Sequence, residues 1–153
     1  MQKFPKQKWS QYGFTVFEVL TVAIIITILA AIAMPNFIRS KDKAYEASLE
    51  TNARTLKLML ETYKVDHAVY PEDLRTLGRD ATQRGYNKSI SNPISRNVGI
   101  VENGAWAVMY TGITGPPGMV AYQPVLDKYY IFGYGAKGDL HQKKGQVFQQ
   151  SNG

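Results

Sequence analysis

Glu18 is the side chain whose chemistry most needs an explanation. It lies in the segment 14–34, which is otherwise apolar apart from a few threonines. A carboxylate at the centre of a membrane-spanning helix costs roughly 2.5–3.5 kcal/mol on insertion scales, and less near an interface. Glu18 therefore predicts either an ion pair with a cationic partner or a carboxylate that only reaches the headgroups at the membrane surface.

None of the other reactive side chains forms a pattern that is typical of catalysis. His67 and His141 are the two histidines, and neither has a pair of carboxylates next to it in the sequence. Glu72 and Asp73 stand where a short helix is expected to start, and acidic residues stabilise that end of a helix. The chain has no cysteine, no G-x-S-x-G sequence and no phosphate-binding loop. We therefore expect a protein that is not an enzyme.

The segment that carries Glu18 has the length of a membrane span. At about 1.5 Å per residue, a helix over 14–34 extends ~31 Å, close to the ~30 Å of a bilayer's hydrocarbon core. A leader over 1–13 precedes it, and the three lysines of that leader supply half of the net charge of +6. Basic flanking residues stay on the cytoplasmic side, so we expect the N-terminus in the cytoplasm.

Two simpler interpretations of this segment compete. A secretory signal has an apolar region of roughly 7–15 residues and then a cleavage site of the A-x-A type. Ala31-Ile32-Ala33 fits such a site, but the apolar run is too long and contains Glu18. A plain single-pass anchor accounts for the length and gives Glu18 no role.

The N-terminal sequence GFTVFEVLTVAIIITILAAIAMP resembles that of type IV pilins and of the pseudopilins of type II secretion. The resemblance rests on a short basic leader that ends at Gly13, on Phe14 directly after it, and on Glu18 four positions later. A long apolar run and then Pro35 complete the pattern. The pair Val16-Phe17 departs from the commoner Leu-Ile without a large change in volume.

This resemblance implies how the N-terminus is processed and used. A prepilin peptidase would cut between Gly13 and Phe14 on the cytoplasmic side and methylate the new amine of Phe14. In a filament, the Glu18 carboxylate would then pair with the Phe14 amine of a neighbouring subunit. A low dielectric strengthens the attraction and also penalises a bare charge, so the pair would fix the axial register of the subunits.

The rest of the chain predicts an α+β fold of the pilin type, in which a long N-terminal helix packs on a C-terminal antiparallel β-sheet. Pro35 is expected to kink the helix, because proline cannot donate a backbone hydrogen bond. We expect three parts: a leader over 1–13, a transmembrane and assembly helix over 14–34, and a globular domain over 35–153. Within the domain we expect a helix over 36–65, a loop over 78–105 and a β-sheet over 106–149.

Apolar spacing supports the helix of the globular domain. One face carries apolar residues at steps of three and four: Leu49, Ala53, Leu56, Leu60 and Tyr63. The opposite face is charged and is expected to face water: Glu46, Glu50, Arg54, Lys57, Glu61 and Lys64. Pro71 ends this region. The stretch YPEDLRTL at 70–77, after the long helix, is similar to the corresponding stretch of major pseudopilins and many pilins. Its Leu74 and Leu77 are spaced to dock on the core.

The last third of the chain predicts strands. Runs rich in aromatic and β-branched residues lie at 106–110, 119–123 and 129–134. Short turns separate the last two runs, which favours an antiparallel sheet. The tail over 142–153 is polar and is expected to fray.

The predicted loop over 78–105 is basic. Its candidate binding residues are Arg79, Arg84, Tyr86, Lys88 and Arg96. Basic residues with an interleaved aromatic can bind DNA, an anionic polysaccharide or an acidic partner. The simpler interpretation, which we favour, is a solvated loop or a connection packed between subunits.

A calcium site is possible in principle but disfavoured. Residues 129–138 resemble the final strand and Gly-rich turn of secretion pseudopilins, which often bind calcium in a loop with several acids nearby. Here the region has only Asp127 and Asp139 as acids, and Lys137 lies between them. Calcium prefers about six to eight oxygen ligands, so we expect no cofactor and no metal. The cysteine pair that closes the C-terminal loop of many pilins is also absent.

Together these observations predict a structural subunit of a type IV pilus or of a type II secretion pseudopilus. The subunit would wait in the inner membrane as a single-pass protein and then join a homo- or hetero-polymeric filament in the periplasm or at the cell surface. Its expected partners are the prepilin peptidase, an inner-membrane assembly platform and other subunits. The alternative is a minor pilin that binds DNA or a surface through the basic residues of 79–96.

Overall fold

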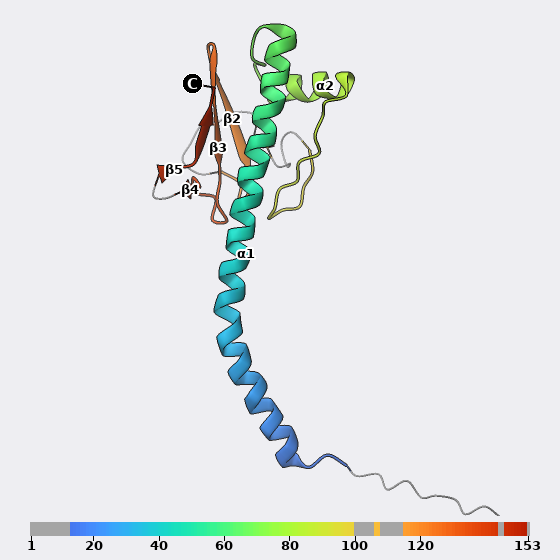
Figure 1. Cartoon of the computed structure of the whole chain (residues 1–153), viewed down its shortest axis with the longest axis vertical. Helices are drawn as coiled ribbons and strands as arrows, with labels where there is room; N and C mark the ends of the chain where they lie inside the picture. The colour runs from blue at the N-terminus through green and yellow to red at the C-terminus, as the bar shows by residue number, and fades with distance from the viewer. Residues whose placement is uncertain (1–12, 100–105, 108–114, 144–145, 153) are drawn as a thin grey trace, which may run out of the picture. The chain divides into compact units, whose positions relative to one another are not determined.

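One helix dominates the N-terminal half of the chain. The computed structural model describes residues 13–99, 106–107, 115–143 and 146–152. Helix α1, Val16–His67, has 52 residues and contains Pro35 (Figure 1). The long N-terminal helix that the sequence predicts, with its two parts over 14–34 and 36–65, is therefore confirmed as one continuous helix. The predicted kink at Pro35 stays a prediction.

The chain divides into two compact units, Met1–Arg39 and Ser40–Gly153. In the first unit, all described side chains are exposed, including large apolar ones such as Phe17, Ile25 and Leu29. By length and composition, the apolar part of α1 is long enough to cross a membrane. A soluble helix normally buries its apolar residues against a core, whereas this one has no core of its own within the unit.

In the second unit, α1 contributes the apolar face that its spacing predicts. Leu49, Ala53, Leu56, Leu60 and Tyr63 are all buried. Asn52 and Met59, which lie on the same face, are buried as well. Each large aliphatic side chain removed from water in this way stabilises the fold by about 1.5–3 kcal/mol.

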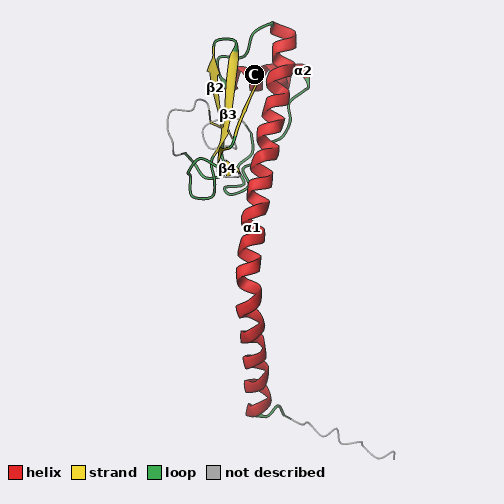
Figure 2. Ribbon diagram, turned by 60° about the vertical axis from the view of Figure 1, so that its left-hand side comes forward, coloured by secondary structure: helices red, strands yellow, loops and turns green. Residues whose placement is uncertain are grey.

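A four-stranded sheet has the order β1-β2-β3-β6. Figure 2 labels its two central strands, β2 and β3, which lie side by side. The strands of the sheet are β1 (Trp106–Ala107), β2 (Val120–Val125), β3 (Lys128–Gly133) and β6 (Gln149–Ser151). The β2–β3 and β3–β6 pairs are antiparallel, which confirms that prediction for these three strands. The β1–β2 pair is parallel, because these strands are joined by a connection long enough for a crossover rather than by a tight turn. A second pair, β4 (Gln142–Lys143) with β5 (Gln146–Val147), forms a separate hairpin.

The prediction that the tail over 142–153 frays is wrong. Strand β6 is hydrogen-bonded to β3 through Tyr130↔Ser151, Ile131↔Gln150 and Phe132↔Gln149. The Lys57 ammonium also donates a hydrogen bond to the Ser151 carbonyl over 2.8 Å. Strand pairing uses backbone groups, so a polar edge strand carries little apolar signal in its sequence.

The predicted loop over 78–105 is wrong in its first part, because helix α2, Leu74–Arg84, extends into it. Asp73 caps the start of α2, with its carboxylate accepting a hydrogen bond from the Thr76 N–H over 2.7 Å. Gly85 ends α2 with φ +79°, a left-handed conformation that favours glycine. An Asp at the start and a Gly just after the end are ordinary helix boundary signals.

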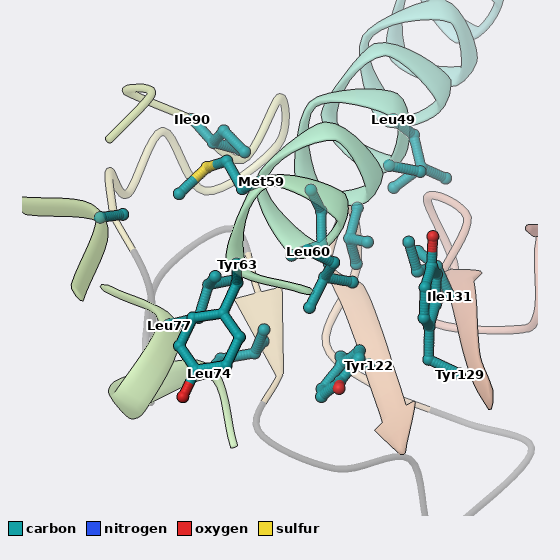
Figure 3. Close-up of a cluster of buried hydrophobic side chains, with 14 of the residues drawn as sticks. Leu49, Met59, Leu60, Tyr63, Leu74, Leu77, Ile90, Tyr122, Tyr129 and Ile131 are labelled. Carbon is teal, nitrogen blue, oxygen red and sulfur yellow. The ribbon is translucent and has the colours of Figure 1, made fainter. Parts of the chain in front are cut away.

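The core lies where α1, α2 and the sheet meet. Figure 3 shows side chains of all three elements in one cluster: Leu49, Met59, Leu60, Tyr63, Leu74, Leu77, Tyr122, Tyr129 and Ile131. Leu74 and Leu77 are fully buried, as their spacing predicts. The Tyr122 hydroxyl donates to the Pro71 carbonyl over 2.8 Å and so ties β2 to the turn before α2. The α+β fold with a helix packed on a sheet is confirmed.

Candidate functional site

The Gly13–Phe14 peptide bond lies in a non-helical segment just before α1. Both residues are exposed, and the Phe14 side chain is 87% accessible. A Cβ added to Gly13 would meet nothing within 4 Å. The chain's own fold therefore does not require glycine at position 13, and a requirement for it would come from a partner that approaches the backbone there.

Glu18 has hydrogen-bond partners within its own helix. Its Oε2 accepts from the backbone N–H of Thr15 over 2.9 Å and from the Thr15 hydroxyl over 2.9 Å. The Glu18 N–H in turn donates to the Thr15 hydroxyl oxygen over 3.2 Å. This reciprocal arrangement is a capping box, which satisfies backbone donors that the first turn of a helix leaves without partners.

The capping box gives Glu18 a role that our sequence reasoning missed. The signal was present, since a threonine followed three residues later by a glutamate at a helix start is the pattern of this motif. In the single chain the carboxylate is thus partly satisfied, yet no described positive group faces it. A cation at the head of a neighbouring helix could still bind it.

The five predicted binding residues do not form one loop. Arg79 and Arg84 are on α2, whereas Tyr86, Lys88 and Arg96 follow it. Arg84 is held by two carboxylates of its own chain, at 3.1 Å from Asp80 and 3.2 Å from Asp66. The Tyr86 hydroxyl donates to Asp80 over 2.6 Å.

Asp80 is the centre of this network. His67 Nε2 lies 2.9 Å from its Oδ1, so the network joins the last turn of α1 to α2. Hydrogen bonds from Tyr86 and then from His67 hold the pKa of the Asp80 carboxyl below its usual value. Burial, followed by the bond to Asp80, raises the pKa of Tyr86. Arg84 and Tyr86 therefore hold α2 in place, although Arg84 is exposed. Arg79, Lys88 and Arg96 of the predicted binding set are exposed as well.

Glu61 does not simply face water, as its place on the charged face of the helix predicted. It accepts hydrogen bonds from the Tyr129 hydroxyl over 2.5 Å and from the Tyr70 hydroxyl over 3.1 Å. Burial, with the bond to Glu61 second, raises the pKa of Tyr129. Asn152 donates to the Tyr70 hydroxyl and to the Asp127 carbonyl, which brings the end of β6 into the same cluster. This cluster stabilises the packing of α1 on the sheet.

No group of three His, Asp or Glu side chains suited to a metal ion occurs among the described residues. Asp127 and Asp139 lie in separate turns, one at the β2–β3 hairpin and the other before β4. The expectation that the chain holds no cofactor stays a prediction.

Several known proteins are similar in sequence to part of this chain. It is 39% identical over 66 residues to type II secretion system core protein G of Vibrio cholerae, which covers 43% of this chain and 45% of that protein. It is 28% identical over 124 residues to the core protein G of Escherichia coli K12. That match covers 71% of this chain and 86% of the relative. The resemblance to type IV pilins and pseudopilins is confirmed.

A second kind of relative of this pseudopilin-like chain is the competence protein ComGC of Halalkalibacterium halodurans, which is 29% identical over 98 residues. That match covers 64% of this chain and 91% of the relative. The chain spans about half the length of the first core G proteins that it matches. No family model and no solved structure matches it. None of these relatives carries the name of an enzyme.

Proposed function

We propose that this pseudopilin-like chain is a structural subunit of a pilus or pseudopilus, held in the inner membrane by α1 and then assembled into a helical filament. The observation that carries this proposal is the head of α1. There Gly13-Phe14 precedes Glu18, which forms a capping box with Thr15, and the described apolar side chains of 14–39 are all exposed. The similarity to secretion core protein G and to ComGC supports it.

In this proposal the leader over 1–13 stays in the cytoplasm, where a prepilin peptidase removes it and methylates Phe14. The cut creates a cationic amine four residues before Glu18. That amine of one subunit then binds the Glu18 carboxylate of the next, which exchanges its hydroxyl bond from Thr15 for a charged partner. The exposed apolar side chains of residues 14–39 leave lipid and pack against their counterparts in a filament core.

The charge pair acts mainly on register. Two charges in a low dielectric attract strongly but lose hydration, so their net contribution to stability is small. A subunit in the wrong axial position leaves a buried amine and a buried carboxylate unpaired, which is strongly unfavourable. We infer that an assembly platform in the inner membrane extracts the subunit into this one register.

The test replaces Glu18 by leucine in the full chain, in cells that make the filament. We expect Glu18→Leu to insert into the membrane at wild-type levels and to lower the yield of sheared filaments at least about tenfold, because an isolated buried amine is strongly disfavoured. Immunoblots of the membrane fraction provide the control for insertion. A normal filament yield from this variant would contradict the register argument.

A role as a DNA- or surface-binding minor pilin is less favoured. Two of the five residues on which it depends, Arg84 and Tyr86, are engaged by Asp66 and Asp80 of the same chain. Retention of the chain on DNA that falls steeply with salt would support this role. Negligible binding at low salt would remove it.

A further inference from the structure

The part of α1 between Glu18 and Arg39 carries no charged side chain. These two residues are 21 positions apart on one continuous helix, so they are separated by roughly 32 Å along its axis. That distance is close to the ~30 Å of a bilayer's hydrocarbon core. If Glu18 lies at the headgroups of one leaflet, which we call the near leaflet, then Arg39 lies at the headgroups of the other, the far leaflet.

The threonines inside this span already have partners in the helix. The Thr21 hydroxyl donates to the Phe17 carbonyl over 2.9 Å. The Thr27 hydroxyl donates to the Ala23 carbonyl over 2.8 Å. A hydroxyl that is hydrogen-bonded within its own helix can face lipid without leaving a polar group unsatisfied. The charged side chain of Arg39 therefore marks the far end of the span.

Three basic residues gather at that far end. Arg39, Lys41 and Lys43 lie within about 6 Å along the helix axis, and all three are exposed. Asp42 is the one acid among them, so the segment 39–43 carries a net charge of +2. A headgroup layer is roughly 5–7 Å thick on each side of the hydrocarbon core. One such layer can therefore contact all three basic side chains.

No carboxylate of the described residues pairs with these cations. Arg39 and Lys43 form no ion pair with a residue in the described part of the chain. The Lys41 ammonium lies 5.5 Å from the centre of the Tyr45 ring, and this contact leaves its charge unneutralised. Each of the three basic side chains can therefore bind an external anion.

The cations surround the helix instead of forming a patch on one side. At 3.6 residues per turn, Arg39 and Lys43 point within about 40° of each other, whereas Lys41 points roughly 160° away from both. A folded protein approaches a helix from one side, but the lipids of a bilayer surround it at one depth. Long basic side chains can reach the phosphates while their stems lie along apolar surface. The arrangement therefore favours phospholipid headgroups over a protein partner.

We propose that Arg39, Lys41 and Lys43 bind the phosphate groups of anionic phospholipids in the far leaflet and so fix the depth of α1 before assembly. The inference rests on the proposed function, because it requires α1 to lie in a membrane. At this depth Glu18, with its capping box, waits at the headgroups of the near leaflet instead of in the hydrocarbon core. Each basic residue close to an anionic bilayer surface favours the bound state by roughly fivefold.

Energy transfer in lipid nanodiscs tests this contact with the full chain. The chain has no cysteine, so Ala33→Cys provides a single site for a donor dye, about 9 Å along α1 from Arg39. Phosphatidylglycerol and phosphatidylcholine, each with an acceptor on an acyl chain, are compared at equal mole fraction in otherwise identical bilayers. We expect transfer that corresponds to a local excess of phosphatidylglycerol of at least about twofold, since the basic segment attracts anionic lipid.

Neutral variants then locate the preference. Arg39→Gln, Lys41→Gln and Lys43→Gln, combined in one chain, should remove most of the excess of phosphatidylglycerol near the dye. The matched control combines Arg75→Gln, Lys128→Gln and Lys137→Gln at exposed positions of the globular unit. It changes the net charge by the same amount and should keep the excess.

Two results would overturn the inference: equal transfer to both lipids in the chain with the native basic segment, or an excess that the neutral variant of 39–43 retains. Quenching of the dye at position 33 separates this failure from a failure of the proposed function. A dye that a lipid-soluble nitroxide quenches and aqueous iodide does not shows α1 in the bilayer, so equal transfer then sinks the lipid contact alone. A dye that iodide quenches fully contradicts the membrane anchor of the proposed function and the inference with it.

Discussion

Glu18 has one set of partners in the single chain and a different partner in the proposed filament. In the single chain it completes a capping box with Thr15. In the proposed filament it binds the amine of Phe14 on another subunit. The capping box gives the carboxylate partners before assembly, which lowers the penalty of holding it in the first turn of an apolar helix. Glu18 can exchange the Thr15 hydroxyl for the Phe14 amine if the charged amine binds the carboxylate more strongly than the hydroxyl does.

The two roles of Glu18 can be separated through Thr15. Thr15→Val removes the hydroxyl of the capping box but keeps the backbone N–H, at a cost of about 1 kcal/mol in helix stability. We expect this variant to yield filaments within about twofold of the wild type. The proposed ion pair between Glu18 and the amine of Phe14 on another subunit does not need the Thr15 hydroxyl.

Sheared filaments and membrane levels of Thr15→Val are to be compared with those of Glu18→Leu in the same cells. If Thr15→Val assembles as poorly as Glu18→Leu, then Glu18 acts by capping its own helix. The pairing of Glu18 with a neighbouring amine would be wrong in that case.

Among the elements, α2 is joined to the end of α1 by one carboxylate, in addition to its buried apolar side chains. Asp80 binds His67 of α1, Arg84 of α2 and the Tyr86 hydroxyl. Its pKa is lower in the folded chain than its usual value. The unfolded carboxyl therefore binds protons first as the pH falls, and the stability that Asp80 supplies is present above about pH 4 and lost as the pH falls through the folded pKa.

This predicts a pH-dependent effect of Asp80→Asn. At pH 7 we expect the variant to lower the unfolding temperature of the detergent-solubilised full chain by a few degrees. The difference from the wild type should shrink as the pH falls from about 4 through the lowered pKa of the folded carboxyl, below which the wild-type carboxyl is neutral as well. Thermal unfolding followed by the tyrosine near-UV signal measures it. A difference that stays constant down to pH 2 would contradict the assignment.

The contact between α1 and β3 depends on a glycine. A Cβ added to Gly133 would lie 2.7 Å from the Leu49 Cδ2 and 2.9 Å from its Cγ. Both residues are buried, and Leu49 is 2% exposed. The helix can approach the strand here because position 133 has no side chain.

Gly133→Ala should therefore destabilise the globular unit by about 1–3 kcal/mol, the usual effect of overpacking a core. Gly85→Ala is an informative comparison, since a Cβ there meets nothing within 4 Å and the left-handed backbone alone opposes it. Chemical denaturation of the two variants measures both effects. An unchanged stability of Gly133→Ala would mean that α1 and β3 are further apart than the structure shows.

The sequence predicted the elements that have a clear apolar period. The face of α1 from Leu49 to Tyr63 and the strands around Tyr122 and Ile131 follow from spacing alone. Helix α2 was underestimated because Gly78 and polar residues interrupt its pattern, although Asp73 and Gly85 mark its ends. Strand β6 was missed because its pairing uses backbone groups.

The candidate site was predictable only in part. The pattern Gly13-Phe14-Glu18 was visible in the sequence. The capping box of Thr15 and Glu18 could also have been predicted from it. The cleft between α1 and the loop over 134–142 could not be predicted, because Asp42 and His141, which both line it, are far apart in the chain. For the same reason, the contact of Glu61 with Tyr129 could not be predicted from a helical face that is otherwise charged.

At the scale of the whole molecule, the two units differ in how they treat apolar side chains. Residues 13–39 expose apolar side chains in every direction, whereas the unit over 40–153 buries its own core. A chain with both properties is suited to pass from a lipid environment to a protein core without refolding its globular part.

The mass of the mature N-terminus tests the central claim most directly. Protein purified from cells that have the prepilin peptidase is digested, and its N-terminal peptide is analysed by mass spectrometry. The proposed function predicts a chain that begins at Phe14 and carries one methyl group on its amine. A chain that begins at Met34, after Ala31-Ile32-Ala33, would show an ordinary secreted protein and would contradict it.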